Sequence, residues 1–300
     1  MRDRRYWLRL VAFFVLALAG ALLFLPLAAG GLLMWGLTHV GCARSGSPDQ
    51  FGLAYEDVRF TTPQGRSIDG YFLPGSNGGT VIVAPSLAND RGGDLADAAI
   101  FNRAGFHVLT FDSPTCAGAP VHSLGYLEAG DAEAAFHYLA SRPDVDASRV
   151  SIHGFSSAGA ASLFAAARRP ELRAVSAKGG YHDLPVLLGV GRDQGFFMSL
   201  IAAGGRLGYR LSTGLDIEVL RPVDVMQAIA PRPVLLIYGS REVSLPGARQ
   251  MLERATAAGV PAELWVVEGA GHGNYHAVAG ETYERRLTDF HRRAFDIPDI

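Results

Sequence analysis

Cysteine is scarce in this sequence, and the usual metal-binding spacings are missing. Cys42 and Cys116 are the only two cysteines among 300 residues, which excludes a disulfide framework but leaves one bridge open. Neither a CxxC nor an HExxH pattern occurs, so a structural or catalytic metal site has little support. We therefore expect a protein that needs no metal and no organic cofactor.

The chain also lacks an excess of charge of either sign. Lysine and arginine together number 27, aspartate and glutamate 29, and the formal net charge is −2. A nucleic-acid-binding protein needs a basic patch or stripe, and none is visible, so we expect no nucleic-acid partner. Hydrophobic residues make up 49% of the chain, which is enough for one large domain with a sizeable core.

Charged residues are missing altogether from Leu10 to Cys42. A run of this length can cross a bilayer core of ~30 Å at ~1.5 Å per residue. Four arginines precede the run and only one lies just after it, and such an excess marks the cytoplasmic side. Residues 1–42 are therefore predicted to be a cytoplasmic stub and a single-pass transmembrane anchor. The rest of the chain would lie outside the cytoplasm, at a bacterial cell membrane.

Two other interpretations of this segment remain open. A cleaved signal peptide has an apolar core of only ~7–15 residues, and this run is much longer, so we favour an uncleaved anchor. A lipoprotein signal would be cut just before Cys42. Gly41 suits that cut, but His39 stands where such signals carry an aliphatic residue.

Short strand and helix patterns alternate from residue 53 to the C-terminus, after a polar linker at residues 43–52. This alternation predicts one α/β domain, 53–300, with a mainly parallel sheet and helices on both faces. Residues 181–222 interrupt it and are predicted to be a small lid, the alternative being a crossover helix with a long loop. Strands are expected at 55–61, 68–73, 80–84, 106–111, 150–153, 172–177, 233–238 and 263–267, and helices at 95–104, 128–139, 246–258 and 280–295.

The segment from Arg149 to Arg168 reads as a strand, a tight turn with a serine, and an alanine-rich helix. This order is typical of a nucleophile elbow, and it makes Ser156 the candidate nucleophile. Gly154 stands two residues before it, but the fifth position of the G-x-S-x-G pattern is Ala158. Ser156 could instead be an N-cap, and Ser157 is a competing nucleophile.

A serine nucleophile needs a histidine base, and the histidine needs a carboxylate that orients it. Glu242 follows the strand at 233–238, and His272 lies in a glycine-rich loop after the strand at 263–267. The order serine, acid, histidine is that of an α/β-hydrolase triad. Four weaker candidates follow the strands at 172–177 and 263–267. They are Asp183 as an alternative acid, Glu268, His276, and Lys178 as a contact for an anionic substrate, although a solvated strand end is the simpler role for Lys178.

The tetrahedral intermediate of acyl transfer needs two backbone N–H donors. One is expected from Ser157, directly after the nucleophile. The other is expected from the loop after the strand at 80–84, where Pro85 has no N–H and Leu87 is the candidate. Cys116 also follows a strand and could line the mouth of the site, but a lone thiol is more often packing.

These motifs resemble those of the α/β-hydrolase superfamily, above all membrane-anchored or secreted bacterial serine hydrolases related to the α/β-hydrolase-domain (ABHD) proteins. The resemblance implies an eight-stranded sheet and a triad of Ser156, Glu242 and His272. This sequence departs from the pattern at Ala84-Pro85-Ser86, where many relatives have His-Gly, at Glu242, where aspartate is usual, and at Ala158. The residues that carry the resemblance are 126–131, 134–135, 138–139, 141–146, 149–159, 221–224, 231–235 and 269–272.

The expected function is hydrolysis of an ester or other acyl bond of a small-molecule substrate through an acyl-enzyme. Two alternatives stay open. The first is a peptidase or thioesterase, and the second is an inactive binding protein on a hydrolase scaffold, since fold does not guarantee function. The apolar segment Leu187–Ile201 weakly favours an apolar acyl group, and protein partners are unknown.

Overall fold

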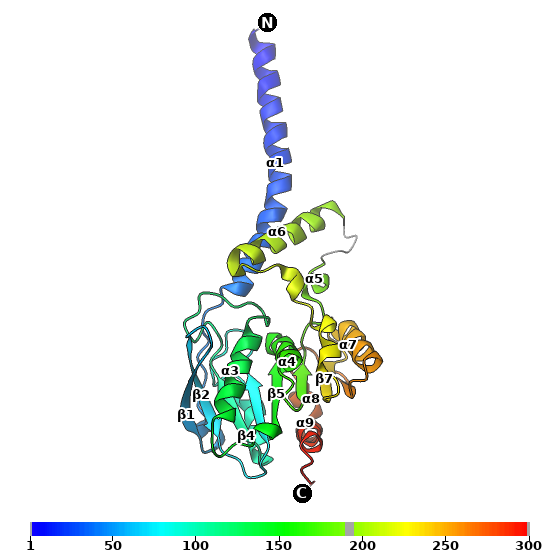
Figure 1. Cartoon of the computed structure of the whole chain (residues 1–300). Helices are drawn as coiled ribbons and strands as arrows, with labels where there is room; N and C mark the ends of the chain where they lie inside the picture. Colours follow the sequence, from blue (N-terminus) through cyan, green and yellow to red (C-terminus); the bar gives the residue numbers. More distant parts are fainter. Residues whose placement is uncertain (1, 190–194, 299–300) are drawn as a thin grey trace. The chain divides into compact units, whose positions relative to one another are not determined.

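A computed structural model describes residues 2–189 and 195–298 (Figure 1). The strands are β1 (Glu56–Thr61), β2 (Ser67–Leu73), β3 (Thr80–Ala84), β4 (His107–Phe111), β5 (Val150–Phe155), β6 (Val175–Lys178), β7 (Val234–Gly239) and β8 (Ala262–Val267). The helices are α1 (Arg2–Thr38), α2 (Leu95–Arg103), α3 (Glu128–Ala140), α4 (Ser157–Arg168), α5 (Leu184–Leu187), α6 (Phe196–Thr213), α7 (Leu245–Ala257), α8 (Tyr275–Ala279) and α9 (Glu281–Ala294). Short 3₁₀ turns connect several of them, at Pro48–Phe51, Ala147–Arg149, Ile217–Val219, Pro222–Asp224 and Met226–Ile229.

The eight strands form one sheet in the order β1-β2-β4-β3-β5-β6-β7-β8. β1 and β2 are an antiparallel hairpin, and β2 also pairs antiparallel with β4. All other neighbours are parallel, as strand–helix alternation requires. The predicted α/β-hydrolase fold with a mainly parallel eight-stranded sheet is confirmed.

Helices cover both faces of this sheet because its central strands are apolar on both sides. On one face, α2 and α9 pack with Val81 and Val83 of β3 and with Leu235 and Ile237 of β7 in one buried cluster. Successive side chains of a strand point to opposite faces, so Ile82 faces the other layer, where α3 and α4 pack together. β5 lies in the middle of the sheet, and the carboxyl end of this rigid strand carries the serine turn.

The N-terminal segment is one helix, α1, which continues through Pro26 and through Gly30-Gly31. Its side chains are largely exposed, with Leu16 at 72% and Phe14 at 61%. By length and composition, α1 is the one helix of the described residues that could cross a membrane, over Asp3–Thr38. An exposed apolar surface of this size is unusual in water, and it is expected in lipid.

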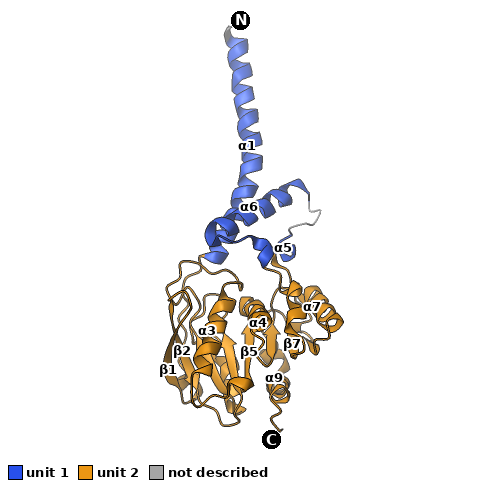
Figure 2. Ribbon diagram, viewed as in Figure 1, with its two compact units in different colours: residues 1–38, 185–219 blue, residues 39–184, 220–300 orange. Residues whose placement is uncertain are grey.

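The contacts divide the chain into two compact units (Figure 2). One unit contains residues 39–184 and 220–300, which include the whole sheet. The other contains residues 1–38 and 185–219, so α6 packs with α1 in that unit. Most of the segment predicted to be a lid therefore belongs with the N-terminal helix, and its role as a lid stays a prediction. Residues 190–194 of that segment lie outside the described residues.

Element boundaries differ from the predictions where turns interrupt an apolar run. The strand expected at 172–177 begins only at Val175, because Leu172 still belongs to the turn after α4 and donates its N–H to the Arg169 carbonyl. α8 precedes the closing helix and was not predicted. It is a single turn between the histidine loop and Gly280, too short for helical periodicity to reveal.

Cys42 and Cys116 form a disulfide bridge, so the expectation that Cys116 is a lone packing thiol is wrong. Two further contacts hold the same segment. The Ala43 N–H donates to the Ala88 carbonyl at 2.7 Å, and the Ser45 N–H donates to the Asp90 carboxylate at 3.1 Å. The chain just after α1 is therefore fastened to the loop that follows β3.

Candidate active site

Ser156 occupies a strained turn between β5 and α4. Its φ of 56° and ψ of −121° lie in a region that a non-glycine residue rarely adopts. The Ser156 N–H donates to the Lys178 carbonyl at 2.9 Å, which joins the turn to the end of the neighbouring strand β6. A Cβ on Gly154 would clash with the Ala158 carbonyl, so the turn is possible only with glycine there. The turn presents the serine side chain at the carboxyl end of the sheet.

Ala158 does not prevent this turn from closing, although the hydrolase pattern has glycine at that position. The side chain of Ala158 is buried at 2% exposure, and the closest approach of the helix to β6 falls one residue later. A Cβ on Gly159 would lie 3.3 Å from the Lys178 carbonyl oxygen and 3.3 Å from the Gly154 carbonyl oxygen. Position 159, like position 158, therefore favours a small residue.

His272 reaches the serine from the loop after β8. Its Nε2 lies 3.2 Å from the Ser156 Oγ, and its ring packs on Phe155 with the ring centres 4.7 Å apart. The Gly271 N–H donates to the Asn274 side-chain oxygen at 2.8 Å, which ties the loop to the start of α8. The histidine side chain is about half exposed, so substrate can approach it.

Glu242 lies behind the histidine and is buried. Its Oε2 is 3.1 Å from the His272 Nδ1, and its Oε1 accepts hydrogen bonds from the Gly239 N–H at 2.7 Å and the Tyr275 hydroxyl at 2.6 Å. Burial by itself raises the pKa of this carboxyl group, but the hydrogen bonds from His272, Gly239 and Tyr275 outweigh it and hold the pKa below its usual value. Glu242 is therefore an anion in hydrogen-bond contact with the imidazole of His272.

The loop after β3 is held by Asp94, the residue just before α2. The Asp94 carboxylate accepts hydrogen bonds from the Ser86 N–H at 3.0 Å, the Ser86 hydroxyl at 3.1 Å and the Asn89 amide at 3.2 Å. Ser86 thus has no N–H to offer an oxyanion. Among the described residues, the N–H groups of Leu87 and Ser157 have no hydrogen-bond acceptor, as two oxyanion donors require.

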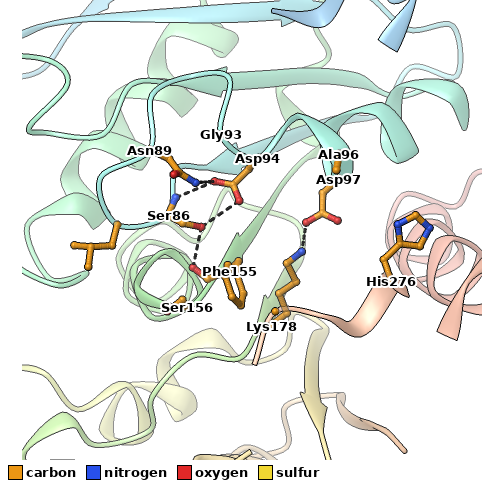
Figure 3. Close-up of a pocket in the computed structure, with 12 residues that line it drawn as sticks. Ser86, Asn89, Gly93, Asp94, Ala96, Asp97, Phe155, Ser156, Lys178 and His276 are labelled. Atoms are coloured by element: carbon orange, nitrogen blue, oxygen red, sulfur yellow. Dashed lines mark hydrogen bonds and ion pairs between the residues drawn. The ribbon is translucent and has the colours of Figure 1, made fainter. Parts of the chain in front are cut away.

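A cavity of about 420 Å³ opens beside Ser156 (Figure 3). Polar side chains form much of its wall. Figure 3 shows Asp94 turned toward Ser86 and Asn89, and Lys178 turned toward Asp97. The lining residues other than glycine and alanine are Ser86, Leu87, Asn89, Asp94, Asp97, Phe155, Ser156, Lys178 and His276.

Lys178, the only lysine of the chain, forms an ion pair with Asp97 at this cavity and donates a hydrogen bond to the Tyr283 hydroxyl at 3.1 Å. The expectation of a solvated strand end is therefore wrong, because α2 and α9 cover this position. Asp97 also accepts from Tyr283 at 3.0 Å and lies 3.1 Å from the His153 Nε2. Burial opposes ionisation of Asp97, but Lys178 and His153 hold its pKa well below the usual range.

The other residues considered from the sequence form no hydrogen bond with Ser156 among the described residues, although His276 lines the same cavity. Glu268 accepts a hydrogen bond from the Ser240 hydroxyl at 3.0 Å, Asp183 pairs with Arg221 at 3.3 Å, and His276 contacts Glu284 at 2.9 Å. Ser157 begins α4 with its side chain buried. The described residues contain no group of three or more histidine, cysteine or acidic side chains that could hold a metal ion.

Sequence patterns did not identify Tyr275, Asp94 or Asp97 as parts of the site. Tyr275 contacts Glu242, 33 positions away, and Asp94 contacts Ser86, eight positions away, through loop conformations that no periodicity encodes. Asp97 and Lys178 are 81 residues apart. The sequence did contain one signal for the ion pair. Lys178 is the single lysine of a chain that otherwise uses arginine, and it stands at a strand end.

The sequence model of the prolyl oligopeptidase family matches residues 121–297, more than half of the chain. This range includes the serine turn, Glu242 and His272. The chain belongs to the prolyl oligopeptidase family. It is accordingly a serine hydrolase with an α/β-hydrolase fold, and the resemblance expected from the motifs is confirmed at the level of the superfamily.

Two relatives come from Mycobacterium tuberculosis. They are the uncharacterized protein MT2364 of strain CDC 1551 and the uncharacterized protein Rv2307c of strain H37Rv. Each is 32% identical to this chain over 120 residues, which are 39% of this chain and 43% of the relative. The chain thus matches less than half of the length of these relatives.

Solved structures share the fold at low sequence identity. An esterase of Pyrococcus furiosus, Pf2001, has a TM-score of 0.68 at 20% identity and covers 86% of this chain and 98% of its own. A puromycin-hydrolyzing peptidase of Mycobacterium tuberculosis has a TM-score of 0.66 at 20% identity and covers 82% of this chain and 40% of its own. Both an esterase and a peptidase therefore use this arrangement of strands and helices.

The buried ion pair makes a prediction for stability. Asp97→Ala leaves Lys178 without its counter-ion, so at pH 7 the free energy of unfolding should fall by about 3–5 kcal/mol. The pKa of Asp97 is depressed in the folded protein. The stability that its charge contributes is therefore fully present above the pKa of the unfolded chain, ~3.9, and is lost as the pH falls below that value. Chemical denaturation between pH 3 and 7 measures both effects.

A second variant isolates the unpaired charge. The double variant Asp97→Ala/Lys178→Met removes both charges, and it should recover most of the stability that the single variant loses. If the double variant is as unstable as the single one, the ion pair is not the reason for the loss.

Proposed function

We propose that this protein is a membrane-anchored hydrolase that cleaves an ester or other acyl bond, with Ser156 as nucleophile, His272 as base and Glu242 as the orienting acid. The observation that carries the proposal is the continuous pair of contacts from Ser156 through His272 to Glu242, at 3.2 Å and 3.1 Å. A serine hydroxyl becomes nucleophilic when a base held in the correct tautomer takes its proton.

The reaction begins when the Ser156 Oγ attacks the acyl carbon and its proton passes to the His272 Nε2. The imidazolium that results carries its other proton on Nδ1, which donates to Glu242. The N–H groups of Leu87 and Ser157 bind the developing oxyanion. His272 then gives its proton to the leaving group, the bond to that group breaks, and the acyl group stays on Ser156. His272 then takes a proton from water as the water oxygen attacks the acyl carbon. The bond to the Ser156 Oγ breaks, His272 returns the proton to that oxygen, and the acid is released.

Amide hydrolysis is the second candidate, because the matched family is named for a peptidase and one neighbour in structure is a puromycin-hydrolyzing peptidase. The same residues serve either bond. A short p-nitrophenyl ester and the corresponding p-nitroanilide separate the two, since a peptidase turns over both and a dedicated esterase turns over only the ester.

The membrane anchor is α1, and the disulfide bridge supports an extracytoplasmic position of the hydrolase unit. Disulfides form and persist in oxidising compartments, and the Cys42–Cys116 bridge lies just after the predicted span. A cysteine in a bridge is not available for lipid attachment, so the bridge also argues against a lipoprotein.

Substitution of the serine tests the nucleophile. The full-length protein in detergent should react with a fluorophosphonate probe and hydrolyse p-nitrophenyl esters, and Ser156→Ala should lose both reactions. Ser157→Ala is the matched control, because it changes the adjacent hydroxyl and keeps the backbone donor. An unreactive wild-type protein would favour the binding-protein alternative, and an unreactive Ser157→Ala variant would move the nucleophile to Ser157.

Substitution of the acid tests whether a glutamate serves in this triad. Glu242→Gln keeps the size of the side chain but removes the charge that stabilises the imidazolium, so kcat should fall by up to about 10⁴. Glu268→Gln, in the neighbouring loop, should leave kcat close to wild type. Steady-state ester hydrolysis measures both, and equal losses in the two variants would contradict the assignment.

Thiol labelling in cells tests the anchor topology. Acid-quenched cells treated with a maleimide polymer should show no labelled protein before reduction and two labels after it. One label before reduction is the result for a lipidated Cys42, and two labels are the result for a cytoplasmic domain. Cys42→Ser is the control, and it should take one label without reduction.

A further inference from the structure

Helix α6 carries a stripe of apolar residues on one side. Phe196, Leu200, Ala203, Leu207 and Leu211 follow one another at spacings of three and four, so they share one face of the helix. We call this face the α6 apolar stripe. Phe196 is 61% exposed, Leu207 57% and Leu211 77%. No described residue covers these three side chains, whereas soluble proteins seldom leave a row of large apolar residues open to water.

The side of α6 next to this stripe packs on α1. A Cβ on Gly204 would clash with the Leu27 carbonyl, and a Cβ on Gly30 would clash with the Ile201 carbonyl. Gly208 likewise approaches the backbone of Gly31. Small residues on both helices therefore let the two backbones touch. Near this contact α1 also exposes apolar side chains, at Leu32, Leu33 and Trp35.

The side of α6 beyond the stripe is polar. Ser199, Arg206 and Arg210 are exposed there at helical spacing, and Arg206 pairs with Glu218 at 3.5 Å. A helix with an apolar face, an arginine-bearing polar face and modest overall hydrophobicity is typical of segments that lie in a membrane interface.

The contact with α1 also gives α6 a depth in the bilayer. A hydrocarbon core of ~30 Å takes ~20 residues of helix. Counted from Leu10, the first residue after the last arginine of the N-terminal cluster, such a span ends near Ala29. The residues of α1 that approach the glycines of α6 include Leu27, Gly30, Gly31 and Met34, which lie at this far boundary and just beyond it. A helix packed at that level lies where headgroups meet acyl chains.

We propose that α6 is an interfacial membrane helix, which lies at the outer boundary of the bilayer beside α1 with its apolar stripe against lipid. This inference rests on the proposed anchoring of α1. Lipid is the occupant that the structure favours, because α6 packs on the predicted span, both helices expose large apolar side chains, and arginines can reach phosphate groups at the edge of the stripe. The segment between β6 and β7, in which α6 lies, is then a second attachment to the membrane.

The test measures which side chains of the full-length protein face lipid. Single cysteines replace Leu207, Leu211, Ser199 or Leu16 in protein reconstituted into phosphatidylglycerol–phosphatidylethanolamine vesicles, and each carries a nitroxide. The native cysteines are joined in a bridge, so only the introduced thiol takes the label. Power saturation compares collision with oxygen, which concentrates in lipid, and with a water-soluble nickel complex. The ratio of oxygen to nickel accessibility at 207 and 211 should be severalfold higher than at 199.

The possible outcomes test the transmembrane anchor α1 and the interfacial helix α6 separately. Leu16 is 72% exposed in the middle of α1, and a high ratio there together with low ratios at 207 and 211 would overturn the interfacial helix alone. Low ratios at all positions would overturn the anchor and the interfacial helix with it. If 207 and 211 are shielded from both relaxers, a second copy of the chain covers the stripe and the proposal is wrong. The exposed substitutions should not disturb folding, and fluorophosphonate labelling of each variant confirms that the hydrolase unit is intact.

Discussion

The structure depends on one constrained turn, in which Ser156 is held at a positive φ between the central strand β5 and the helix α4. A non-glycine residue remains in this conformation only where its surroundings impose it. Gly154 admits the close approach of Ala158, and the Lys178 carbonyl accepts the Ser156 N–H at 2.9 Å. The strand beneath is buried on both faces, so the strain is borne by the most rigid part of the sheet. The serine is thereby presented to the histidine loop.

Two buried carboxylates, Glu242 and Asp97, have different partners. Glu242 accepts hydrogen bonds from a backbone N–H, a tyrosine and the histidine, and it remains an anion, while the side chain of His272 is about half exposed. Asp97 is neutralised by the only lysine of the chain and closes the wall of the cavity. Because both groups are buried, the loss of either partner would leave an unpaired charge and destabilise the fold.

Much of the fold and of the proposed triad could be predicted because each depends on local sequence. Strand–helix alternation predicted the sheet, and Ser156, Glu242 and His272 each follow a strand in the expected order. Tyr275, Asp94 and Asp97 were missed, since their partners are set by loop conformation or by contacts between distant elements. Lys178 was assigned to solvent because nothing local showed that α2 and α9 would cover it. The partner of α6 was also beyond sequence periodicity, which shows an apolar face but not the helix against which it packs.

The central claim is that Ser156 carries the acyl group during turnover. The most direct measurement is to quench the full-length protein with acid a few milliseconds after mixing with a p-nitrophenyl ester and to locate the acyl group by mass spectrometry of its peptides. One acyl group per chain is expected on Ser156. An acyl group on Ser157, or hydrolysis with no covalent intermediate, would contradict the account.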